Sequence, residues 1–320
     1  MGAPRGRYAP SPTGAIHLGN ARTALLAWLD ARAAGAAFVM RVEDLDRARV
    51  PADAEARLLE DLRWLGLDWD EGPDRGGAFG PYRQSERAAR YDDAVARLLA
   101  AGRAFPCACS RADVARAASA PHAADEEGPR YPGTCRGLAA VEVEARAAAQ
   151  GRACVIRFDG RGERISFEDA LVGPVLAPEL GLDDFVLRRA DGTASYQLAV
   201  VVDDAAMEIS RVVRGDDLLT STPRQLALYA ALGWPAPSFA HVPLVLAPGG
   251  ERLAKRTRPA SLADLRARGA SPAVVVGALA ASAGLGGERR PARELVDGFS
   301  LARLTRGSSV IDAEGLASLT

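Results

Sequence analysis

The chain has 320 residues, of which 48% are hydrophobic and 25% charged, so it can bury more than one core and we expect two or three packed modules. Its formal net charge of −1 gives no global basic field that would indicate nucleic acid. No apolar run approaches the roughly 20 residues of a membrane helix, and the N-terminus lacks the apolar stretch of a signal peptide. We therefore expect a soluble globular protein of the cytoplasm.

The first hundred residues alternate short apolar stretches with helical periodicity, which is typical of an α/β unit with parallel strands. The Pro and Gly residues at positions 10–14 exclude regular structure from the loop after the first strand. A proline is expected to open the second helix, and glycines are expected to end the second and third. The predicted elements are strands at 6–9 and 37–42 and helices at 20–34, 51–66 and 85–101.

The pattern changes from Phe105, where a cysteine cluster, an acidic Ala-rich stretch and mixed short strands indicate an insertion that reaches to about Arg189. Beyond it, the α/β pattern resumes and the end of the chain is mostly helical in pattern. We predict β-rich segments at 194–202 and 208–213 and helices at 222–232, 261–268 and 272–284. The resulting division is a first α/β half (1–102), an insertion (103–190), a second α/β half (191–250) and a C-terminal part (251–320).

Two residue types occur only once. The chain has 39 arginines beside the single lysine, Lys255, and its single asparagine is Asn20. A chain that otherwise avoids both types suggests that these two positions did not tolerate a substitute. The alternative is that the single lysine and the single asparagine remain at these positions by chance.

The junction between the first strand and the first helix has the features of an anion site. A strand that ends in a Gly/Pro loop and opens a helix points backbone N–H groups and the positive end of the helix dipole at a ligand. Gly19 lets that ligand approach the backbone, and His17 supplies a side-chain donor. The string Arg7-x-Ala-Pro-Ser-Pro-Thr-Gly-x-x-His-Leu-Gly-Asn resembles the extended HIGH signature of the glutamyl branch of class I aminoacyl-tRNA synthetases. The alternative is a histidine that caps a structural helix.

This resemblance implies a Rossmann-type α/β catalytic domain, split by an insertion that carries a zinc site and followed by a short helical C-terminal segment. It implies that ATP, with Mg²⁺, is bound by His17, Gly19, Asn20 and Lys255. His17 and Lys255 would be the catalytic residues.

Lys255 lies in a second basic loop, Glu251-Arg252-Leu253-Ala254-Lys255-Arg256, which resembles the KMSKS loop of the same family. Arg252 replaces the first Lys of that pattern and Ala254 its Ser. In the implied reaction, the carboxylate of glutamate attacks the α-phosphate of ATP, and His17, backbone amides and Lys255 stabilise the charge on the departing pyrophosphate. A compact, mobile lysine charge suits a loop that follows a leaving phosphate.

A site for glutamate must neutralise two carboxylates and one ammonium, which requires at least one Arg in bidentate geometry and a carboxylate for the amine. The glutamyl pattern implies that Arg7 holds the side-chain carboxylate and that Ser11 and Glu43 hold the amine. Tyr196 and Arg214 would contact the remaining polar groups. A single Arg in such an arginine-rich chain is most often a solvated surface residue, but five matches in order argue against that alternative.

Cys107, Cys109 and Cys135 cluster in the sequence as metal ligands do. Three thiolates and one O or N donor satisfy the tetrahedral preference of Zn²⁺. The Cys-x-Cys…Tyr-x-x-x-Cys spacing resembles the zinc site of the short glutamyl-queuosine tRNA(Asp) synthetases, which implies Tyr131 as the fourth ligand of one structural zinc ion. The alternatives are His122 as the fourth ligand, or no metal and small buried residues.

The chain ends soon after Lys255, whereas a glutamyl-tRNA synthetase continues into helical domains that read the anticodon. The resemblance is therefore to the short family, which activates glutamate without tRNA and transfers it to queuosine at the wobble position of tRNA(Asp). The implied partners are L-glutamate, ATP and the anticodon loop of tRNA(Asp), with the protein acting as a monomer. The alternatives are a truncated glutamyl-tRNA synthetase that charges the tRNA 3′ end and a catalytically inactive RNA-binding paralogue.

Overall fold

The structure is a computed structural model that describes all residues except 1–2, 48–49, 118–129, 180, 247–260 and 312–320. Its first unit is a βαβ crossover. Strands β1 (Arg5–Tyr8) and β2 (Ala37–Met40) pair in parallel, with Arg5 opposite Ala37 and Tyr8 opposite Met40. Helix α1 (Leu18–Ala33) connects them, as the alternation of apolar stretches predicts.

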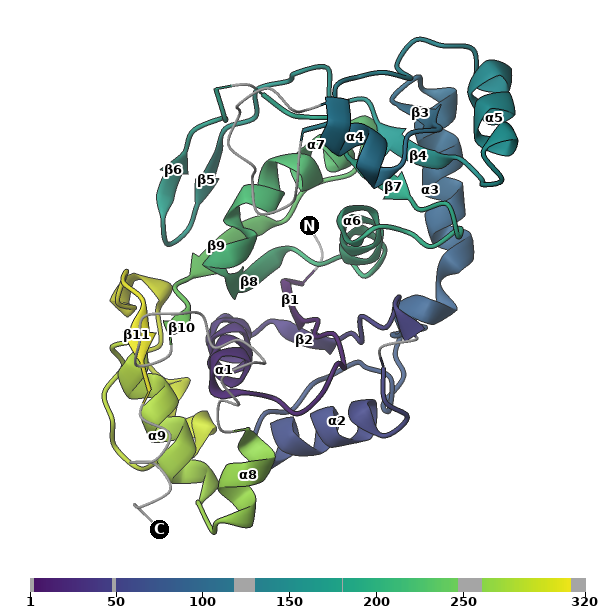
Figure 1. Ribbon diagram of the computed structural model, residues 1–320. Helices are drawn as coiled ribbons and strands as arrows, with labels where there is room; N and C mark the ends of the chain where they lie inside the picture. Colours follow the sequence, from purple (N-terminus) through teal and green to yellow (C-terminus); the bar gives the residue numbers. More distant parts are fainter. Residues whose placement is uncertain (1–2, 48–49, 118–129, 180, 247–260, 312–320) are drawn as a thin grey trace.

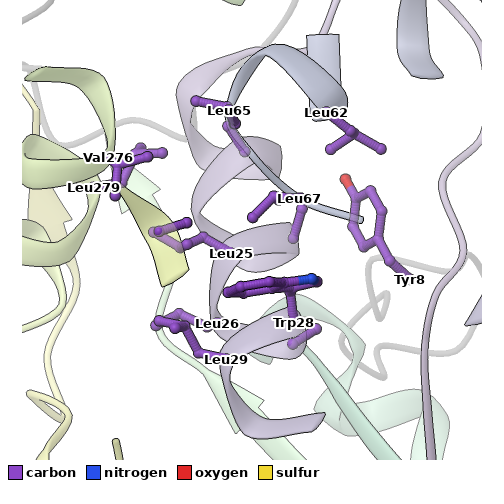
Figure 2. Close-up of a cluster of buried hydrophobic side chains, with 14 of the residues drawn as sticks. Tyr8, Leu25, Leu26, Trp28, Leu29, Leu62, Leu65, Leu67, Val276 and Leu279 are labelled. Atoms are coloured by element: carbon purple, nitrogen blue, oxygen red, sulfur yellow. The ribbon is translucent and has the colours of Figure 1, made fainter. Parts of the chain in front are cut away.

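Helix α1 is the centre of the main hydrophobic core. It is covered by α2 (Ala54–Trp64) and by α9 (Pro272–Ser282), which brings the C-terminal part of the chain against the first crossover. Figure 2 shows Leu25, Leu26 and Leu29 of α1 on the side of Leu279 of α9, with Leu62 of α2 on the opposite side. Each such fully buried leucine contributes about 1.5–3 kcal/mol relative to an exposed one, so the packing fixes the position of α1.

A second sheet has the strand order β6-β5-β9-β8. Its strands are β5 (Phe167–Asp169), β6 (Gly173–Val175), β8 (Arg211–Gly215) and β9 (Ser238–Val242). Strands β5, β9 and β8 are parallel, and β6 is antiparallel to β5. Strand β8 also lies beside β1, because the Ser210 N–H donates to the Arg5 carbonyl at 3.0 Å. The parallel pair β1-β2 and the four-stranded sheet therefore lie side by side, with β1 next to β8.

The region between the α/β halves contains a small antiparallel sheet of order β3-β4-β7, at the top of Figure 1. Its strands and neighbouring helices are β3 (Ala104–Cys107), β4 (Val155–Phe158), β7 (Val186–Arg188), α3 (Ala88–Ala100), α4 (Arg111–Ala117) and α5 (Ala140–Ala149). Strands β5 and β6 come from the same stretch of sequence but join the sheet of β8 and β9.

The C-terminal part returns to α1. It contains β10 (Val245–Leu246), α8 (Leu262–Ala267), α9 and β11 (Ser309–Val310), which pairs in parallel with β10. The buried side chain of Arg22 on α1 connects this part to the first crossover. Its guanidinium donates to the Ser309 hydroxyl at 2.7 Å, to the Ser282 carbonyl at 3.2 Å and to the Pro243 carbonyl. Among the helices of the described residues, none is both long and apolar enough to cross a membrane.

The prediction of a β-rich segment at 194–202 is wrong. These residues begin helix α6 (Tyr196–Ala206), whose N-cap Ser195 accepts a hydrogen bond from the Leu198 N–H. Residues 198–204 are all buried, so the helix shows no polar stripe, and its run of valines resembles a buried strand. The helix predicted at 222–232 is confirmed as α7 (Thr222–Leu232), which ends at Gly233 in the left-handed conformation.

Candidate active site

The loop after β1 leads to His17, which is the N-cap of α1. The imidazole Nδ1 accepts a hydrogen bond from the Asn20 N–H at 3.4 Å, and the His17 carbonyl accepts one from Ala21 at 3.0 Å. Burial lowers the pKa of His17, which keeps the ring neutral. A neutral ring whose Nδ1 accepts must carry its proton on Nε2. The sequence-predicted donor is therefore held at the positive end of α1 with Nε2–H available.

Gly19 and Asn20 complete the first turn of α1. A Cβ on Gly19 would lie 3.3 Å from the His17 ring, which is closer than most side chains come, and in ordinary contact with Val245 at 3.8 Å. Asn20 is exposed, and its carbonyl accepts a hydrogen bond from the Tyr8 hydroxyl at 3.2 Å. Glycine thus leaves this turn open beside the histidine.

Arg7 and Glu43 lie at the carboxyl ends of β1 and β2. The Glu43 N–H donates to the Pro10 carbonyl at 3.0 Å, which continues the pairing of the two strands beyond their regular ends. Arg7 is buried, its Nη1 donates to the Val213 carbonyl at 3.4 Å, and its Nε has no hydrogen-bond partner among the described residues. A buried guanidinium with a spare donor suits an anionic ligand.

Glu43 is a largely buried carboxylate that feels the charges of two arginines, Arg41 and Arg7. Burial raises its pKa to about 7, although the charges of Arg41 and Arg7 oppose that shift. Its side chain is 3.5 Å from the Arg41 guanidinium. The carboxylate therefore changes charge close to neutral pH, and a bound cation would favour its ionised form.

Arg214, at the end of β8, is held by several acceptors. Its Nε donates to His241 Nε2 at 3.0 Å, Nη1 to the Gln225 side chain at 2.8 Å and Nη2 to the Thr222 hydroxyl at 2.9 Å. Tyr196 begins α6 nearby, and the charges of Arg214, Glu43 and Arg7 all act on its pKa, which burial raises. The structure thus brings four of the five predicted glutamate residues together.

Ser11 is the exception among these five. It is exposed in the loop after β1, where its carbonyl accepts a hydrogen bond from the Thr13 N–H at 2.8 Å. Two other predicted residues, Lys255 and the alternative zinc ligand His122, lie outside the described residues.

Behind Arg7 and Glu43 lies a buried network of charges that sequence reasoning missed. Arg41 contacts Asp204 at 2.7 Å and Asp203 at 3.6 Å, and Arg7 Nε is 3.5 Å from the same Asp204. Asp203 also accepts from Arg87 at 2.5 Å. Removing one member of such a network leaves an uncompensated buried charge. The available signal was the Asp203-Asp204 pair inside an otherwise apolar segment.

The three predicted thiols form one cluster, with all three sulfurs within 4.8 Å of one another. Cys109 and Cys135 Sγ are 3.8 Å apart, and the Tyr131 hydroxyl lies 3.3 Å from Cys107 Sγ and 3.9 Å from Cys109 Sγ. The Arg157 guanidinium lies 4.0 Å over the Tyr131 ring. The fourth cysteine, Cys154, packs at the edge of the same small core.

Comparison with known proteins assigns the class. Residues 4–303 match the family described as tRNA synthetases class I (E and Q), catalytic domain, and the chain belongs to that family. The chain is 55% identical over 317 residues to the Glutamyl-Q tRNA(Asp) synthetase of Symbiobacterium thermophilum, with 98% of each chain covered. It is 51% identical to the protein of the same name from Nocardia farcinica, with 97% of this chain and 94% of the relative covered.

Longer relatives share the same fold. The chain is 45% identical to Glutamate--tRNA ligase 2 of Acidithiobacillus ferrooxidans, of which it covers 64%. The solved glutamate-tRNA synthetase of Elizabethkingia anophelis superposes with a TM-score of 0.85 at 30% identity, covering 99% of this chain and 70% of that one. The fold predicted from the resemblance, a class I synthetase α/β catalytic domain with parallel strands, is thereby confirmed.

Proposed function

We propose that this protein activates L-glutamate with ATP, without tRNA, and transfers the glutamyl group to queuosine at the wobble position of tRNA(Asp). The observation that carries the proposal is the convergence of Arg7, Arg214 and Glu43 at the carboxyl ends of three strands, beside the N-terminus of α1. The near full-length similarity to relatives named Glutamyl-Q tRNA(Asp) synthetase supports the choice of acceptor.

In this proposal Arg7 and Arg214 provide the positive charge for the carboxylates of glutamate, and Glu43 pairs with its ammonium group. The Arg7 Nε lies 3.5 Å from Asp204 without a hydrogen bond, and among the described residues the buried guanidinium donates only from Nη1, to the Val213 carbonyl, so a ligand carboxylate would improve its pairing. Tyr196 closes the site from α6, and Ser11 contributes from the exposed loop.

ATP, with Mg²⁺, is proposed to bind along the first turn of α1, at His17, Gly19 and Asn20. The described residues on either side of the Lys255 segment support a role for that lysine at the same nucleotide. On one side, Val245 lies 3.8 Å from the place that a Cβ of Gly19 would occupy. On the other, Ser261 forms a β-bridge with His17, and the Leu262 N–H donates to the Ile16 carbonyl at 2.8 Å.

In the first step, an oxygen of the glutamate α-carboxylate attacks the α-phosphorus of ATP, and pyrophosphate leaves as glutamyl-adenylate forms. The His17 Nε2–H and the Lys255 ammonium stabilise the charge that develops on the phosphate oxygens. In the second step, a hydroxyl of queuosine attacks the glutamyl carbonyl carbon and AMP leaves. Both steps use one site, so the anticodon loop must reach the region between α1 and α6.

The activation step is tested by glutamate-dependent exchange of labelled pyrophosphate into ATP in the absence of tRNA. We expect exchange with L-glutamate and none with L-glutamine or L-aspartate, because the site is built for one side-chain carboxylate at one distance. A chain that binds RNA without exchanging pyrophosphate would be the inactive paralogue.

Glu43 gives the activation step a pH dependence. The pKa of its carboxyl is raised to about 7, so the group is mostly neutral at pH 6 and mostly ionised at pH 8. Only the ionised form pairs with the ammonium of glutamate, so kcat/KM for glutamate is expected to fall about tenfold from pH 8 to pH 6. The Glu43→Gln variant should be slow and lack this slope. A slope of the same size in that variant would assign the titration to another group.

A zinc ion fits the cysteine cluster. With Zn–S bonds of about 2.3 Å, a tetrahedral site places its sulfurs about 3.8 Å apart, which is the separation of Cys109 and Cys135. We assign Cys107, Cys109, Cys135 and Tyr131 as the ligands, since the Tyr131 hydroxyl lies among the sulfurs. Four protein ligands leave no open position, so the ion would stabilise the β3-β4-β7 region and take no part in catalysis.

The zinc assignment predicts about one equivalent of zinc in protein purified in reducing buffer. Tyr131→Phe should lose zinc to a chelator faster than the wild type, whereas His122→Ala, the matched control for the alternative ligand, should not. The readout is zinc content by elemental analysis after timed dialysis. Less than half an equivalent in the wild type would contradict the site, and a reversed order of the two variants would make His122 the ligand.

The insertion at 103–190, the monomeric state and the location in the cytoplasm stay predictions from the sequence. Within residues 103–190, strands β3, β4 and β7 form one sheet, whereas β5 and β6 belong to the sheet that also contains β8 and β9.

A further inference from the structure

Arg214 is connected to a buried chain of side chains that comes from outside the predicted site. His241 on β9 is fully buried, and its Nε2 lies 3.0 Å from Arg214 Nε. Its Nδ1 lies 2.6 Å from Asp169 Oδ2, at the end of β5. The chain Asp169–His241–Arg214 therefore crosses three neighbouring strands of one sheet.

The geometry selects one protonation state of His241. Arg214 Nε can only donate, so His241 Nε2 must accept and carry no proton. The ring proton therefore resides on Nδ1, which donates to Asp169. An imidazolium would put an N–H against the N–H of Arg214. Burial and the Arg214 charge lower the pKa of His241, while Asp169 and Asp216 oppose the shift, which fits a neutral ring.

Asp169 is held in a fixed orientation. Its Oδ1 accepts the backbone N–H groups of Leu171 at 3.0 Å, Val172 at 2.9 Å and His241 at 3.2 Å, which leaves Oδ2 for the imidazole. The ring is further confined by Phe239, which stacks on it with centroids 6.1 Å apart. Neither the carboxylate nor the imidazole can turn without breaking several contacts.

We propose that Asp169 and His241 are positioning residues for glutamate recognition: Asp169 fixes the Nδ1–H tautomer of His241, and His241 Nε2 fixes the orientation of the Arg214 guanidinium. This inference rests on the proposed function in so far as Arg214 binds a carboxylate of glutamate. Through Asp169 on β5 and His241 on β9, the region between the two α/β halves is connected to Arg214 of the substrate site.

The substitution Asp169→Asn tests the tautomer. The asparagine oxygen must take the place of Oδ1 to accept the three backbone N–H groups, so its NH₂ group faces His241 Nδ1. His241 must then carry its proton on Nε2, against Arg214 Nε–H. We expect KM for glutamate in pyrophosphate exchange to rise about tenfold or more, the size of one lost hydrogen bond to a charged group, with KM for ATP changed less than twofold.

Asp184→Asn is the matched control. Asp184 is also a buried carboxylate of the same stretch, and it accepts from the Gly160 N–H at 2.9 Å and from Arg136, away from Arg214. Its loss should lower thermal stability without changing the ratio of the two KM values. An unchanged KM for glutamate in Asp169→Asn, or an equal rise in both KM values, would overturn the proposal.

A second measurement reads the tautomer in the wild-type protein and uses a variant only to assign the signal. The chain has three histidines, so ¹⁵N NMR of histidine-labelled wild-type protein can resolve the tautomer of each ring, with His241→Gln used to assign the signal. We expect His241 to be neutral with its proton on Nδ1 at pH 7. An Nε2–H ring or an imidazolium would overturn the proposal, whether or not the wild type exchanges pyrophosphate. Absent exchange in the wild type would instead overturn the proposed function.

Discussion

Replacing Arg7 by Ala is expected to raise KM for glutamate about a hundredfold and to leave KM for ATP nearly unchanged. Arg7 is a buried guanidinium whose Nε lies 3.5 Å from Asp204 without a hydrogen bond, and the other charged residue of β1, Arg5, is engaged with Glu71. Removing one partner of a buried charge pair costs about 2–5 kcal/mol, and a factor of one hundred corresponds to about 2.7 kcal/mol. The measurement is steady-state pyrophosphate exchange with each substrate varied in turn.

Arg5 provides the matched control for this experiment. It lies two residues earlier on β1 and is engaged elsewhere, with Glu71 at 2.8 Å and the Met207 carbonyl at 2.8 Å. Arg5→Ala should therefore lower the melting temperature and leave KM for glutamate and KM for ATP nearly unchanged. Arg7→Ala should fold with reduced stability, because it removes one of the two arginines beside Asp204 while Arg41 keeps its contact at 2.7 Å. Equal changes in KM for glutamate and for ATP would remove Arg7 from the amino-acid site.

Replacing Lys255 by Ala is expected to reduce pyrophosphate exchange by a factor of about 10²–10³, the cost of losing one donor to a developing oxyanion. The effect should fall on kcat, since the charge on pyrophosphate develops only as the bond breaks. The described residues on both sides of the Lys255 segment lie beside the proposed nucleotide site, since Ser261 forms a β-bridge with His17 and β10 contacts α1.

A substitution of Arg252 distinguishes a specific role of Lys255 in catalysis from a general need for positive charge. Arg252→Ala removes a charge from the same stretch of sequence, at the position where the resembling pattern has its first lysine. It should reduce exchange much less than Lys255→Ala does. A near-wild-type rate for Lys255→Ala would contradict the assignment of the loop.

The sequence predicted the elements that depend on local signals. The Gly/Pro loop and the helix behind it are where the pattern placed them, with His17 as N-cap, and α7 and its glycine stop agree with the prediction. The failure at 194–202 has a physical cause. Helix α6 is buried around its whole circumference, and valines that favour strands are tolerated there because tertiary packing outweighs their weak preference.

The residues that hold the predicted site residues in place, such as Asp169, His241 and Asp204, could not be predicted from local sequence signals. Asp169 and His241 are 72 positions apart, and their contact exists only because β5 and β9 are neighbours in one sheet. Asp204 likewise meets Arg41 across 163 positions. No short-range pattern encodes such pairs, whereas Arg7, Glu43, Tyr196 and Arg214 were predicted from the strings around them.

The proposed acceptor is tested most directly by transfer of labelled glutamate to two preparations of tRNA(Asp), one containing queuosine and one lacking it. We expect that only the queuosine-containing tRNA is labelled, and that the label stays with the anticodon-loop fragment after nuclease digestion. Labelling of tRNA(Glu), or of queuosine-free tRNA(Asp) at its 3′ end, would contradict it and make the protein a glutamyl-tRNA synthetase of the ordinary kind.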